Sequence, residues 1–516
     1  MSIVLIGDIG WRNHSHLGDD AMTEAAIAEL KARGRDDVVL TAGHPDAATE
    51  VYGLPAVPRF GIAGSWDRAR AVARVDEIVQ TADRDHPTVA AIASADALLI
   101  AGGGNLNSRY LHLALDRICA VRLAEKFGVP IFVSSQTVGP IVSDEDRALI
   151  MEIPEKATLF GARDSASARA VAGATGVVRT MDDAVALAPS AVAGLPERFV
   201  VGSFAPNPEG SGLTAAEYAR EIARTLDGLS SSLDAEILLI PHIGSLLPGT
   251  DGVDQRIHAE IIASSGSGRL RDTGMMSARD AIAYSEQALL SISTRYHPTV
   301  FAPMVGTPAI GIALNYYSSI RMRGALENVG LEDFVAPAET WLSGGVEAMA
   351  TELVARSDEF STHMAEVRVT RERELAVWWD ALAAGMSGAT VPAPPDLAEV
   401  PNFEPRGEWG VPLRPVTRVS DQLGLERLQG ERQAAQIEEL QAAQTALSSK
   451  VSTMQGDLAA SRAQLESSLG KNAKQERELT GLRSALAERE TELDVARSRR
   501  SVRIADALGS LLRGKR

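Results

Sequence analysis

The sequence contains one cysteine, Cys119, among 516 residues. A single cysteine excludes an internal disulfide bond and any metal site that needs several thiolates. Cys119 stands in an apolar stretch with helical spacing, so we expect a buried, inert thiol rather than a nucleophile. Long apolar runs are missing too, because no window reaches the roughly 18 uninterrupted apolar residues that a membrane-spanning helix needs.

Positive charge is also scarce. The 51 Lys and Arg residues face 68 Asp and Glu, and the resulting formal charge of −17 argues against a nucleic-acid-binding protein. The apolar run near the N-terminus, residues 3–6, is too short for a signal peptide, and no basic region precedes it. We therefore expect a cytoplasmic protein. Abundant Ala, Arg and Asp with little Lys are typical of a GC-rich bacterial genome.

Short apolar runs alternate with helical patterns over residues 1–190 and again over residues 191–340. Such alternation predicts parallel sheets flanked by helices. Residues 341–385 predict helices that pack back across both halves. The expected architecture is α/β, with two doubly wound Rossmann-like domains facing one cleft, as in GT-B-like proteins. The expected strands are 2–7, 38–40, 97–101, 131–135, 158–161, 199–204, 236–240, 288–293 and 308–312, with the short apolar run 177–178 closing the first half, and the clearest helices are 21–33, 215–229, 252–263, 278–285 and 296–304.

Glycine-bearing loops follow two of the expected N-terminal strands. Residues 8–20 carry Gly18, and the strand 97–101 is followed by Gly102-Gly103-Gly104-Asn105. Glycine lets the backbone curl around a ligand or a neighbouring loop. Neither loop has the spaced glycines of the dinucleotide fingerprint or the Gly-Lys-Ser/Thr of a P-loop, so we reject nicotinamide binding and ATPase activity. Asp19 either caps the next helix or binds a ligand.

The stretch from Ser291 to Ala302 carries Arg295 and His297 between a buried strand and a helix. Ser293 and Thr294 are residue types that cap helices, and Pro298 falls in the first helical turn. The carboxyl ends of strands in open α/β sheets bind ligands, and helix amides there favour anions. The stretch therefore predicts a phosphate or carboxylate site. The alternative is that Arg295 pairs with a nearby acid and His297 fills space.

These motifs follow one another in a recognisable order. In the first half they are Gly18-Asp19-Asp20-Ala21, Ala95-Asp96, Gly102-Gly103-Gly104, Gln136, Gly139-Pro140, Arg163-Asp164, Ser167 and Asp182. In the second half they are Ser293-x-Arg295-x-His297, Ala302, Gly306-x-Pro308, Leu326 and Gly330. With this order residues 1–340 resemble the polysaccharide pyruvyl transferase family.

Two positions depart from the pattern of that family. Its first loop usually reads Asn-x-Gly-Asp, whereas this chain has His16-Leu17-Gly18-Asp19, with Asn13 three residues earlier. Members often carry Tyr-x-x-Lys before the final helix, whereas this chain has Tyr316-Tyr317 and then Arg321. An arginine keeps the positive charge but cannot act as an acid, so Arg321 fits a phosphate clamp better than a proton donor.

The resemblance implies a transferase that moves pyruvate from phosphoenolpyruvate to a sugar, usually as a ketal across two hydroxyls. The first domain would face the acceptor and the second the donor. Nothing in the motifs demands a metal, and phosphoenolpyruvate is a co-substrate, so we expect no cofactor. The implied site comprises His297 as the catalytic acid, Asp19 as the base, Arg295, His242 and Arg321 around the donor, and Gly18, Gly102, Gly103, Gly104 and Asn105 as acceptor-side loops.

The last third of the sequence is of a different kind. Residues 386–420 are rich in Pro, Gly and acids, and they predict a linker or strap. Residues 421–496 follow a heptad pattern, which predicts a coiled coil and a homodimer. With Ile437 at position a, Asn472 also falls at a and sets the register of a parallel dimer. Ser461, Ser468, Gln475 and Arg489 are weak d positions, so a solitary solvated helix is the alternative.

The final segment, residues 497–516, reverses the charge of the chain. Val502, Ala505, Leu508 and Leu512 fall on one helical face flanked by arginines. Such a basic amphipathic helix can lie on an anionic membrane surface, here the inner leaflet, or dock on an acidic protein. Membrane contact would suit an enzyme that acts on lipid-linked glycans.

Three functions remain open from the sequence alone. The first is a pyruvyl transferase that modifies a cell-surface glycan or its precursor, with a sugar, oligosaccharide or lipid-linked glycan as acceptor. The second is a GT-B glycosyltransferase that uses a nucleotide sugar, because architecture alone does not separate the two. The third is a coiled-coil scaffold with a degenerate catalytic body. The presence of both Arg295 and His297 argues against this third function.

Overall fold

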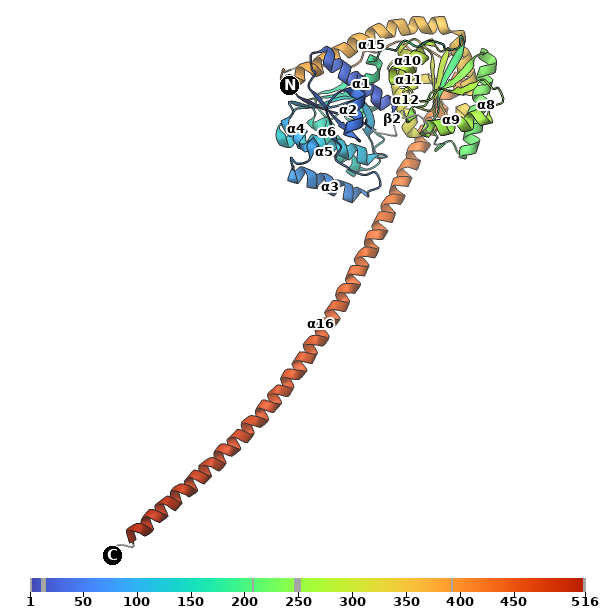
Figure 1. The fold of residues 1–516 in the computed structure, drawn as a ribbon. Helices are drawn as coiled ribbons and strands as arrows, with labels where there is room; N and C mark the ends of the chain where they lie inside the picture. Colours follow the sequence, from blue (N-terminus) through green and yellow to red (C-terminus); the bar gives the residue numbers. More distant parts are fainter. Residues whose placement is uncertain (1, 11–14, 207, 246–251, 391–392, 514–516) are drawn as a thin grey trace. The chain divides into compact units, whose positions relative to one another are not determined.

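The computed structural model describes residues 2–10, 15–206, 208–245, 252–390 and 393–513. Residues 1–430 form one compact unit and residues 431–516 a second (Figure 1). Parts of three predicted segments lie outside the described residues. These are Asn13 in the first loop, Val391 and Pro392 in the linker, and residues 514–516 in the tail.

The first half of the larger unit contains a parallel sheet with the strand order β4-β3-β1-β5-β7-β8-β9, and β6 pairs with β7. The chain starts in the middle of this sheet and winds outward on both sides, which is the expected doubly wound arrangement. Its elements are β1 (Ile3–Ile6), α1 (Leu17–Ala32), β3 (Val38–Ala42), α2 (Pro45–Tyr52), β4 (Ala56–Pro58), α3 (Arg68–Thr81), α4 (Pro87–Ser94), β5 (Ala97–Ile100), β6 (Gly103–Leu106), α5 (Leu111–Phe127), β7 (Ile131–Val138), α6 (Asp144–Lys156), β8 (Leu159–Ala162), α7 (Ser165–Ala170), β9 (Val177–Arg179) and the 3-10 turn η1 (Asp183–Ala186).

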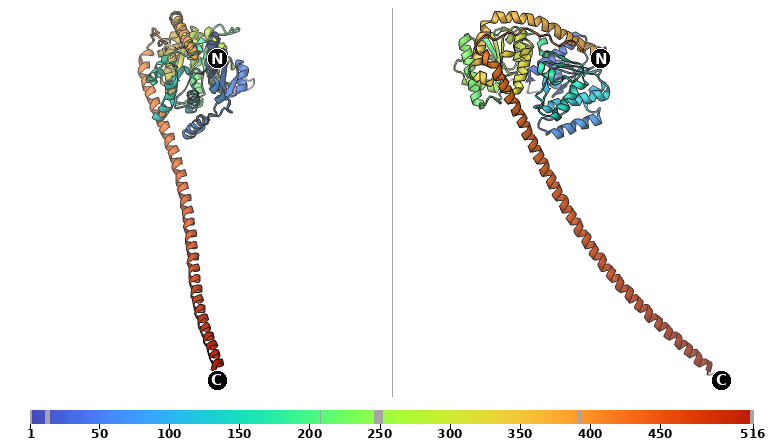
Figure 2. Two further views of the ribbon diagram at one scale, coloured as in Figure 1. Left: turned by 90° about the vertical axis from the view of Figure 1, so that its left-hand side faces the viewer. Right: turned by 180° about the vertical axis from the view of Figure 1, so that it is seen from behind.

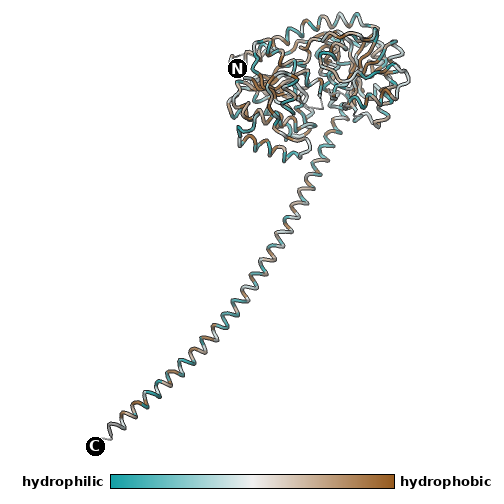
Figure 3. Tube along the Cα trace, viewed as in Figure 1, coloured by the Kyte–Doolittle hydropathy of each residue, from teal (hydrophilic) through white to brown (hydrophobic). Residues whose placement is uncertain are grey.

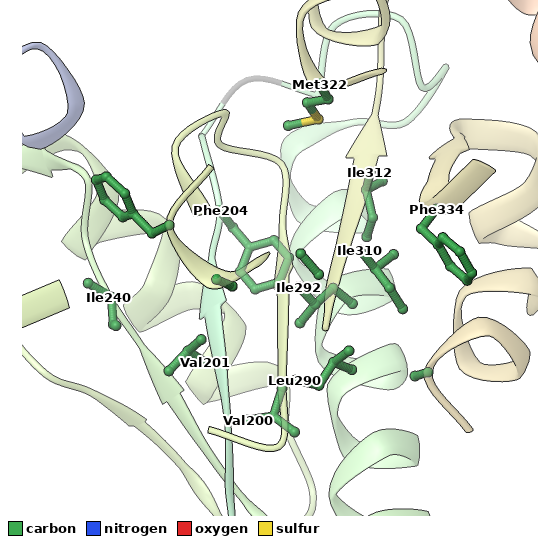
Figure 4. Packing of buried hydrophobic residues seen from close by; sticks show 14 of the residues in the cluster. Val200, Val201, Phe204, Ile240, Leu290, Ile292, Ile310, Ile312, Met322 and Phe334 are labelled. Carbon is green, nitrogen blue, oxygen red and sulfur yellow. The ribbon is translucent and has the colours of Figure 1, made fainter. Parts of the chain in front are cut away.

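The second half contains a parallel sheet with the strand order β13-β11-β10-β14-β15-β16. Side chains such as Val200, Leu290, Ile292 and Ile310 pack together in its core (Figure 4). Its elements are β10 (Phe199–Ser203), α8 (Ala215–Leu233), β11 (Glu236–Leu239), α9 (Val253–Ser264), β13 (Leu270–Asp272), α10 (Ala278–Gln287), β14 (Leu290–Ser293), α11 (Pro298–Met304), β15 (Ala309–Ala313), α12 (Tyr316–Glu327), the 3-10 turn η2 (Glu332–Phe334), β16 (Val335–Pro337), α13 (Ala338–Leu342) and α14 (Gly345–Ala355).

The two halves are joined by direct contacts. The short strands β2 (Ser15–His16) and β12 (Ile243–Gly244), one from each half, pair antiparallel. The N–H of Leu17 also donates to the carbonyl of His242 at 2.9 Å. These bonds hold the start of α1 against the loop that follows β11.

Helix α15 (Ser357–Met386) spans both halves (Figure 2). Near its start, Phe360 and Met364 lie in the hydrophobic core of the second half. Near its end, Trp378 and Trp379 lie in a core of the first half, where the indole N–H of Trp378 donates to the Ser134 hydroxyl at 3.0 Å. This helix therefore ties the two sheets together, and the fold is the predicted pair of GT-B-like domains.

The linker predicted over residues 386–420 is wrong at its C-terminal end, because helix α16 (Gly410–Arg513) begins ten residues earlier than 420. Pro412 falls within the first four helical residues, whose N–H groups have no intrahelical acceptor in any helix. Residues 393–409 form a strap on the larger unit rather than a free linker. Phe403 is buried, and its N–H donates to the carbonyl of Gly330 at 2.8 Å.

The first turns of α16 remain part of the larger unit. Leu413 is buried there, and Arg323 donates to Asp421 at 3.2 Å. Gly424 lies on the start of α12, where a Cβ added to it would stand 3.0 Å from Cβ of Tyr316. The root of α16 therefore packs against the helix α12.

From residue 431 onward α16 forms the second unit, a single helix in which apolar and polar residues alternate along the length (Figure 3). Its large apolar side chains are exposed. Among the described residues, no helix is both long enough and apolar enough to cross a membrane.

Candidate active site

A cavity of about 350 Å³ lies between the two halves. It opens at the carboxyl ends of β1, β10, β11, β14 and β15, where open α/β sheets bind their ligands. Its lining comes from both sheets and comprises Asp8, His16, Gly18, Asp19, Gly104, Asn105, Arg109, Tyr110, Leu113, Ala205, His242, Ile243, Thr294, Arg295, Tyr296, His297, Leu314, Asn315, Tyr317, Ser318, Arg321 and Met322.

The cavity brings together most of the residues expected from the sequence. His297, Asp19, Arg295, His242, Arg321, Gly18, Gly104 and Asn105 all line it. Gly102 and Gly103 do not. The N–H of Gly102 donates to the carboxylate of Asp183 at 3.1 Å, and residues 103–106 form the strand β6 instead of a loop. These two glycines therefore contribute to the packing of the backbone next to the cavity and not to its lining.

His297 stands immediately before α11, with Pro298 in the first turn as expected. The predicted capping role of Ser293 and Thr294 is wrong: His297 is the N-cap residue, and the Thr294 hydroxyl accepts from the N–H of Ala205 at 2.9 Å. Burial lowers the pKa of His297 to about 3, so its imidazole is neutral near pH 7. Its Nε2 has no hydrogen-bond partner among the described residues.

At Gly18 the first half of the molecule lies directly against His297 of the second half. A Cβ at Gly18 would overlap the imidazole ring of His297. Helix α1 starts at Leu17, four residues before the expected start, and the carboxylates of Asp19 and Asp20 lie in its first turn, where the helix dipole favours them. Asp19 is therefore not the helix cap, and only a glycine lets α1 begin this close to His297.

Arg295 has an acidic partner. Its guanidinium pairs bidentately with the fully buried Asp254, with Nε at 3.0 Å from Oδ2. The same carboxylate accepts from the N–H groups of His242 and Ile243 at 3.0 and 2.9 Å. Arg295 thus fixes the loop that carries His242, and Asp254 neutralises its charge, as the alternative interpretation of the sequence stated.

His242 lies beside this pair and is neutral as well. Burial, and next the neighbouring His297, lower the pKa of His242 to about 3. The rings of His242 and His297 both pack on Phe301, at centroid distances of 6.0 and 5.6 Å. Neither histidine therefore supplies the positive charge that the sequence led us to expect.

Positive charge comes from Arg321 on α12 and from Arg163 after β8. A Cβ at Gly104 would stand 3.1 Å from both guanidiniums, and the ring of Tyr296 contacts both, at 4.4 Å from Cζ of Arg163 and 4.7 Å from Cζ of Arg321. Nη1 of Arg321 donates to the Tyr317 hydroxyl at 2.9 Å. Nε of Arg321 and Nη2 of Arg163 are buried and have no acceptor among the described residues. Arg321, which lines the cavity, therefore has an N–H group that can bind an anion, whereas the charge of Arg163 is paired with Asp182.

The carboxylate of Asp182 contacts Arg163 and Tyr296 of this cluster. It accepts from Arg163 at 2.7 Å and from the Tyr296 hydroxyl at 3.2 Å, and it lies 3.9 Å from Nε2 of His297. Its other oxygen caps η1 by accepting from the N–H of Ala184 at 2.9 Å. Asp182 therefore orients Arg163 and Tyr296 around His297.

His16 and Asp19 face the cavity from the first half. Nδ1 of His16 lies 3.3 Å from Oδ2 of Asp19. Burial opposes protonation of His16, but the hydrogen bond and charge of Asp19 outweigh it and raise the pKa of His16. Asp8, His16 and Asp19 each bring a ligand atom within 4.8 Å of the others. However, Asp8 already accepts from Arg59 at 2.6 Å, and a guanidinium at that position repels a cation, so the trio is a poor metal site.

The family model for polysaccharide pyruvyl transferases matches residues 16–316, which is more than half of the chain. The chain belongs to the polysaccharide pyruvyl transferase family. The match starts at His16 and ends at Tyr316, so it encloses both sides of the cavity except Asp8 and the residues of α12 beyond its first. No curated protein matches the chain in sequence.

Solved structures share the fold of this pyruvyl transferase family member. A putative UDP-N-acetylglucosamine 2-epimerase from Listeria monocytogenes is 13% identical, with a TM-score of 0.52, over 77% of this chain and 100% of that chain. An S. aureus MnaA–UDP co-structure is 11% identical, with a TM-score of 0.51, over 77% of this chain and 100% of that chain. These likenesses show a GT-B-like fold.

Several residues in the cavity or next to it were missed in the sequence of this transferase. Arg163 was part of a motif but received no role, although an arginine directly after the buried strand 158–161 is a usable signal. His16 was noted only as a departure from the family pattern. No signal in the sequence indicated that Tyr296 contacts two guanidiniums, because Arg163 and Arg321 lie far from it along the chain.

Proposed function

We propose that this chain transfers pyruvate from phosphoenolpyruvate to a sugar of a cell-surface glycan or its precursor and forms a pyruvate ketal. Family membership supports the reaction class. The single observation that carries the donor assignment is Arg321, a guanidinium that lines the cavity and has an unused N–H group. Phosphoenolpyruvate carries a phosphate and a carboxylate, and both are acceptors for such groups.

In this proposal the donor phosphate or carboxylate binds Arg321 at the wall of the cavity. The absence of a side chain at Gly104 lets its backbone approach both arginines closely, since a Cβ would already stand 3.1 Å from them. Arg295 contributes indirectly, because it holds the His242 loop through Asp254. This assignment makes Arg321, which the sequence already placed at the donor, the main anion contact in place of Arg295.

The first chemical step adds a sugar hydroxyl to the enol carbon of the donor. The hydroxyl oxygen bonds to C2, its proton passes to the base, and His297 gives a proton to the methylene carbon, which becomes a methyl group. Asp19 acts as the base through His16, since a carboxylate hydrogen-bonded to an imidazole orients it and stabilises its charged form. A second hydroxyl then bonds to C2 and gives its proton to the imidazole of His297, which is thereby restored, while the bond from C2 to the phosphate oxygen breaks and the ketal and phosphate leave.

His297 must carry a proton when it acts as the acid. Burial lowers its pKa to about 3. The bound anionic donor adds negative charge beside the imidazole, and negative charge raises the pKa of a histidine. Binding of the donor therefore favours protonation of His297, the acid that acts on it.

The acceptor and the location of the enzyme are further parts of the proposal. A lipid-linked glycan at the inner membrane surface fits the basic C-terminal segment, in which Arg499, Arg500 and Arg503 flank the exposed side chains of Val502, Ile504 and Leu508. Of the face predicted there, the side chain of Leu512 lies outside the described residues. We expect no cofactor besides the co-substrate.

The test is an acceptor screen with phosphoenolpyruvate. Purified chain is incubated with phosphoenolpyruvate and a panel of sugars, oligosaccharides and lipid-linked glycans, and both phosphate release and product mass are measured. We expect acceptor-dependent phosphate release with a product that has gained a pyruvate ketal. Release of a nucleotide from a UDP-sugar, with no reaction of phosphoenolpyruvate, would replace this proposal with a glycosyltransferase. Turnover of neither donor class would favour a scaffold.

A further inference from the structure

Helix α16 carries a row of exposed apolar side chains in the second unit. From residue 437 to residue 495 these are Ile437, Leu440, Leu447, Val451, Met454, Leu458, Leu465, Leu469, Leu479, Leu482, Leu486, Leu493 and Val495, and each is at least 46% exposed. With Ile437 at position a of a heptad, all of them except Leu469 and Val495 fall at a or d. Exposure of this apolar seam to water is energetically unfavourable, so we expect a partner to cover it.

The charges beside the seam identify the partner. In a parallel, in-register pair of identical helices, a residue at g faces the residue at e that lies five positions later in the other helix. The g and e positions that both carry charge are Asp457 with Arg462, Lys471 with Glu476, Glu478 with Arg483, and Glu492 with Arg497. Each of these pairs is of opposite sign. The remaining g–e combinations along residues 443–490 contain at most one charge, so no pair is repulsive.

Asn472 supports the same arrangement. It falls at position a between the uncharged d positions Ser468 and Gln475. Residues at a face their own copies only when two helices are parallel and in register, and a paired asparagine at a is a known means of fixing that register. An asparagine opposite an apolar d residue would be buried without a partner.

We propose that two copies of this chain pair through residues 437–497 as a parallel, in-register coiled coil. By chain connectivity the two larger units are then attached at one end of the coil and the two basic tails at the other. The polar d positions Ser461, Ser468, Gln475 and Arg489 give a dimer that dissociates on dilution. The proposal does not depend on the reaction that the larger unit catalyses.

The charge pairs are tested by swapping them in full-length chains. One variant reverses two g positions (Lys471→Glu with Glu478→Lys), and a second reverses their e partners (Glu476→Lys with Arg483→Glu). Either variant alone turns four attractive contacts per dimer into repulsive ones, so its dimer dissociation constant should rise at least about tenfold. An equimolar mixture restores every pair and should dimerise as tightly as the wild type. The control swaps charges off the seam (Glu466→Lys with Lys474→Glu) and should change nothing.

Sedimentation velocity over a range of concentrations gives the readout. A wild-type chain that stays monomeric at tens of micromolar, or that forms a trimer or tetramer, overturns the proposal. A mixture of the two variants that dimerises no better than either alone overturns the parallel register.

Two separate cysteine variants test orientation. Ser461→Cys and Ala496→Cys place a thiol at d positions 35 residues apart, and a parallel, in-register dimer brings each thiol next to its own copy. Both variants should form interchain disulfides under mild oxidation, whereas Ala473→Cys at an outer position and the wild type, whose Cys119 is buried, should not. An antiparallel dimer can cross-link at one matched position only. Cross-linking of one variant alone, or of neither, overturns the proposal.

Discussion

Gly18 at the start of α1 and His297 at the start of α11 come from different halves of the molecule and touch, with no room for a methyl group between them. Replacing Gly18 with alanine must push the imidazole or the helix aside. Misplacing a reacting group by about 1 Å can lower turnover about 100-fold, and we expect a loss of that size for Gly18→Ala. Phosphate release from phosphoenolpyruvate measures it.

Gly173 offers a matched control. A Cβ there meets open space, and its backbone is not in the left-handed region. Gly173→Ala should therefore keep wild-type turnover. If Gly18→Ala also kept full turnover, the contact with His297 would have no catalytic meaning.

His297→Ala should abolish turnover while leaving the fold intact. General acid catalysis contributes roughly 100-fold to 10,000-fold, and no other imidazole contacts both Asp182 and the cavity in the described part of the chain. Circular dichroism and donor binding by calorimetry should stay close to wild type. The exposed His44 gives the control variant His44→Ala. Near-wild-type turnover without His297 rules out its role as the acid.

Arg321 should govern donor affinity. Arg321→Gln removes a charge-assisted contact that is worth about 1.5–3 kcal/mol, so KM for phosphoenolpyruvate should rise between about 10-fold and 150-fold with a smaller change in kcat. Arg321→Lys restores the charge and the residue type that the family often carries, and it should recover part of the affinity. Equal KM values for the glutamine variant and the wild type would place the donor elsewhere.

His16 and Asp19 should act as one unit. His16→Asn installs the family residue and removes the imidazole, and we expect kcat to fall about 10-fold to 100-fold with the acidic limb of the pH profile shifted. Asp19→Asn should cost a similar factor, and the double variant should cost little more than either single one, because residues that act together are not additive. Additive losses would separate their roles.

The stability of the protein should depend on its buried histidines. Burial lowers the pKa of His242 and His297 to about 3, whereas in the unfolded chain each titrates near 6.5. Between these values the unfolded chain binds more protons, so the stabilisation is complete above about pH 6.5 and is lost as the pH falls. Each histidine contributes a slope of about 1.4 kcal/mol per pH unit in that window.

Asp183 works in the opposite direction, because burial raises its pKa to about 7 and favours the folded state below that pH. A comparison of variants removes its contribution. Denaturant unfolding of wild type and His297→Ala at pH 7.5, 6.5 and 5.5 should show the difference between them shifting in favour of the variant as the pH falls. A difference that is constant with pH would mean that His297 is not buried neutral in the fold.

The sequence predicted the buried strands better than the edges of the sheets. All nine strands that we expected are present, because short apolar runs between turn signals identify parallel strands that are buried in the interior of a sheet. The strands β4, β9, β13 and β16 were not predicted, because each is three residues long and lies at a sheet edge, where it carries too little pattern to be recognised. The two-residue strands β2 and β12 were missed as well, and β6 was expected to be a glycine loop.

Individual residues of the site could be predicted from the sequence, but the contacts between them could not. Arg295 and His297 stand out because they follow a strand and precede a helix. The ion pair between Arg295 and Asp254 could not be predicted, because the packing of α9 against the loop after β11 brings the two residues together. The low pKa of His297 likewise depends on burial by both halves, which no local pattern shows.

Where the chain is cut decides what a deletion of the helix measures. Shortening the protein after Gly430 leaves the larger unit whole. Shortening it after Trp409 also takes away Asp421 and Gly424, which lie against α12, the helix of Arg321. Lost activity in the shorter protein would then reflect a loosened wall of the cavity. Only the longer one separates dimer assembly from donor binding.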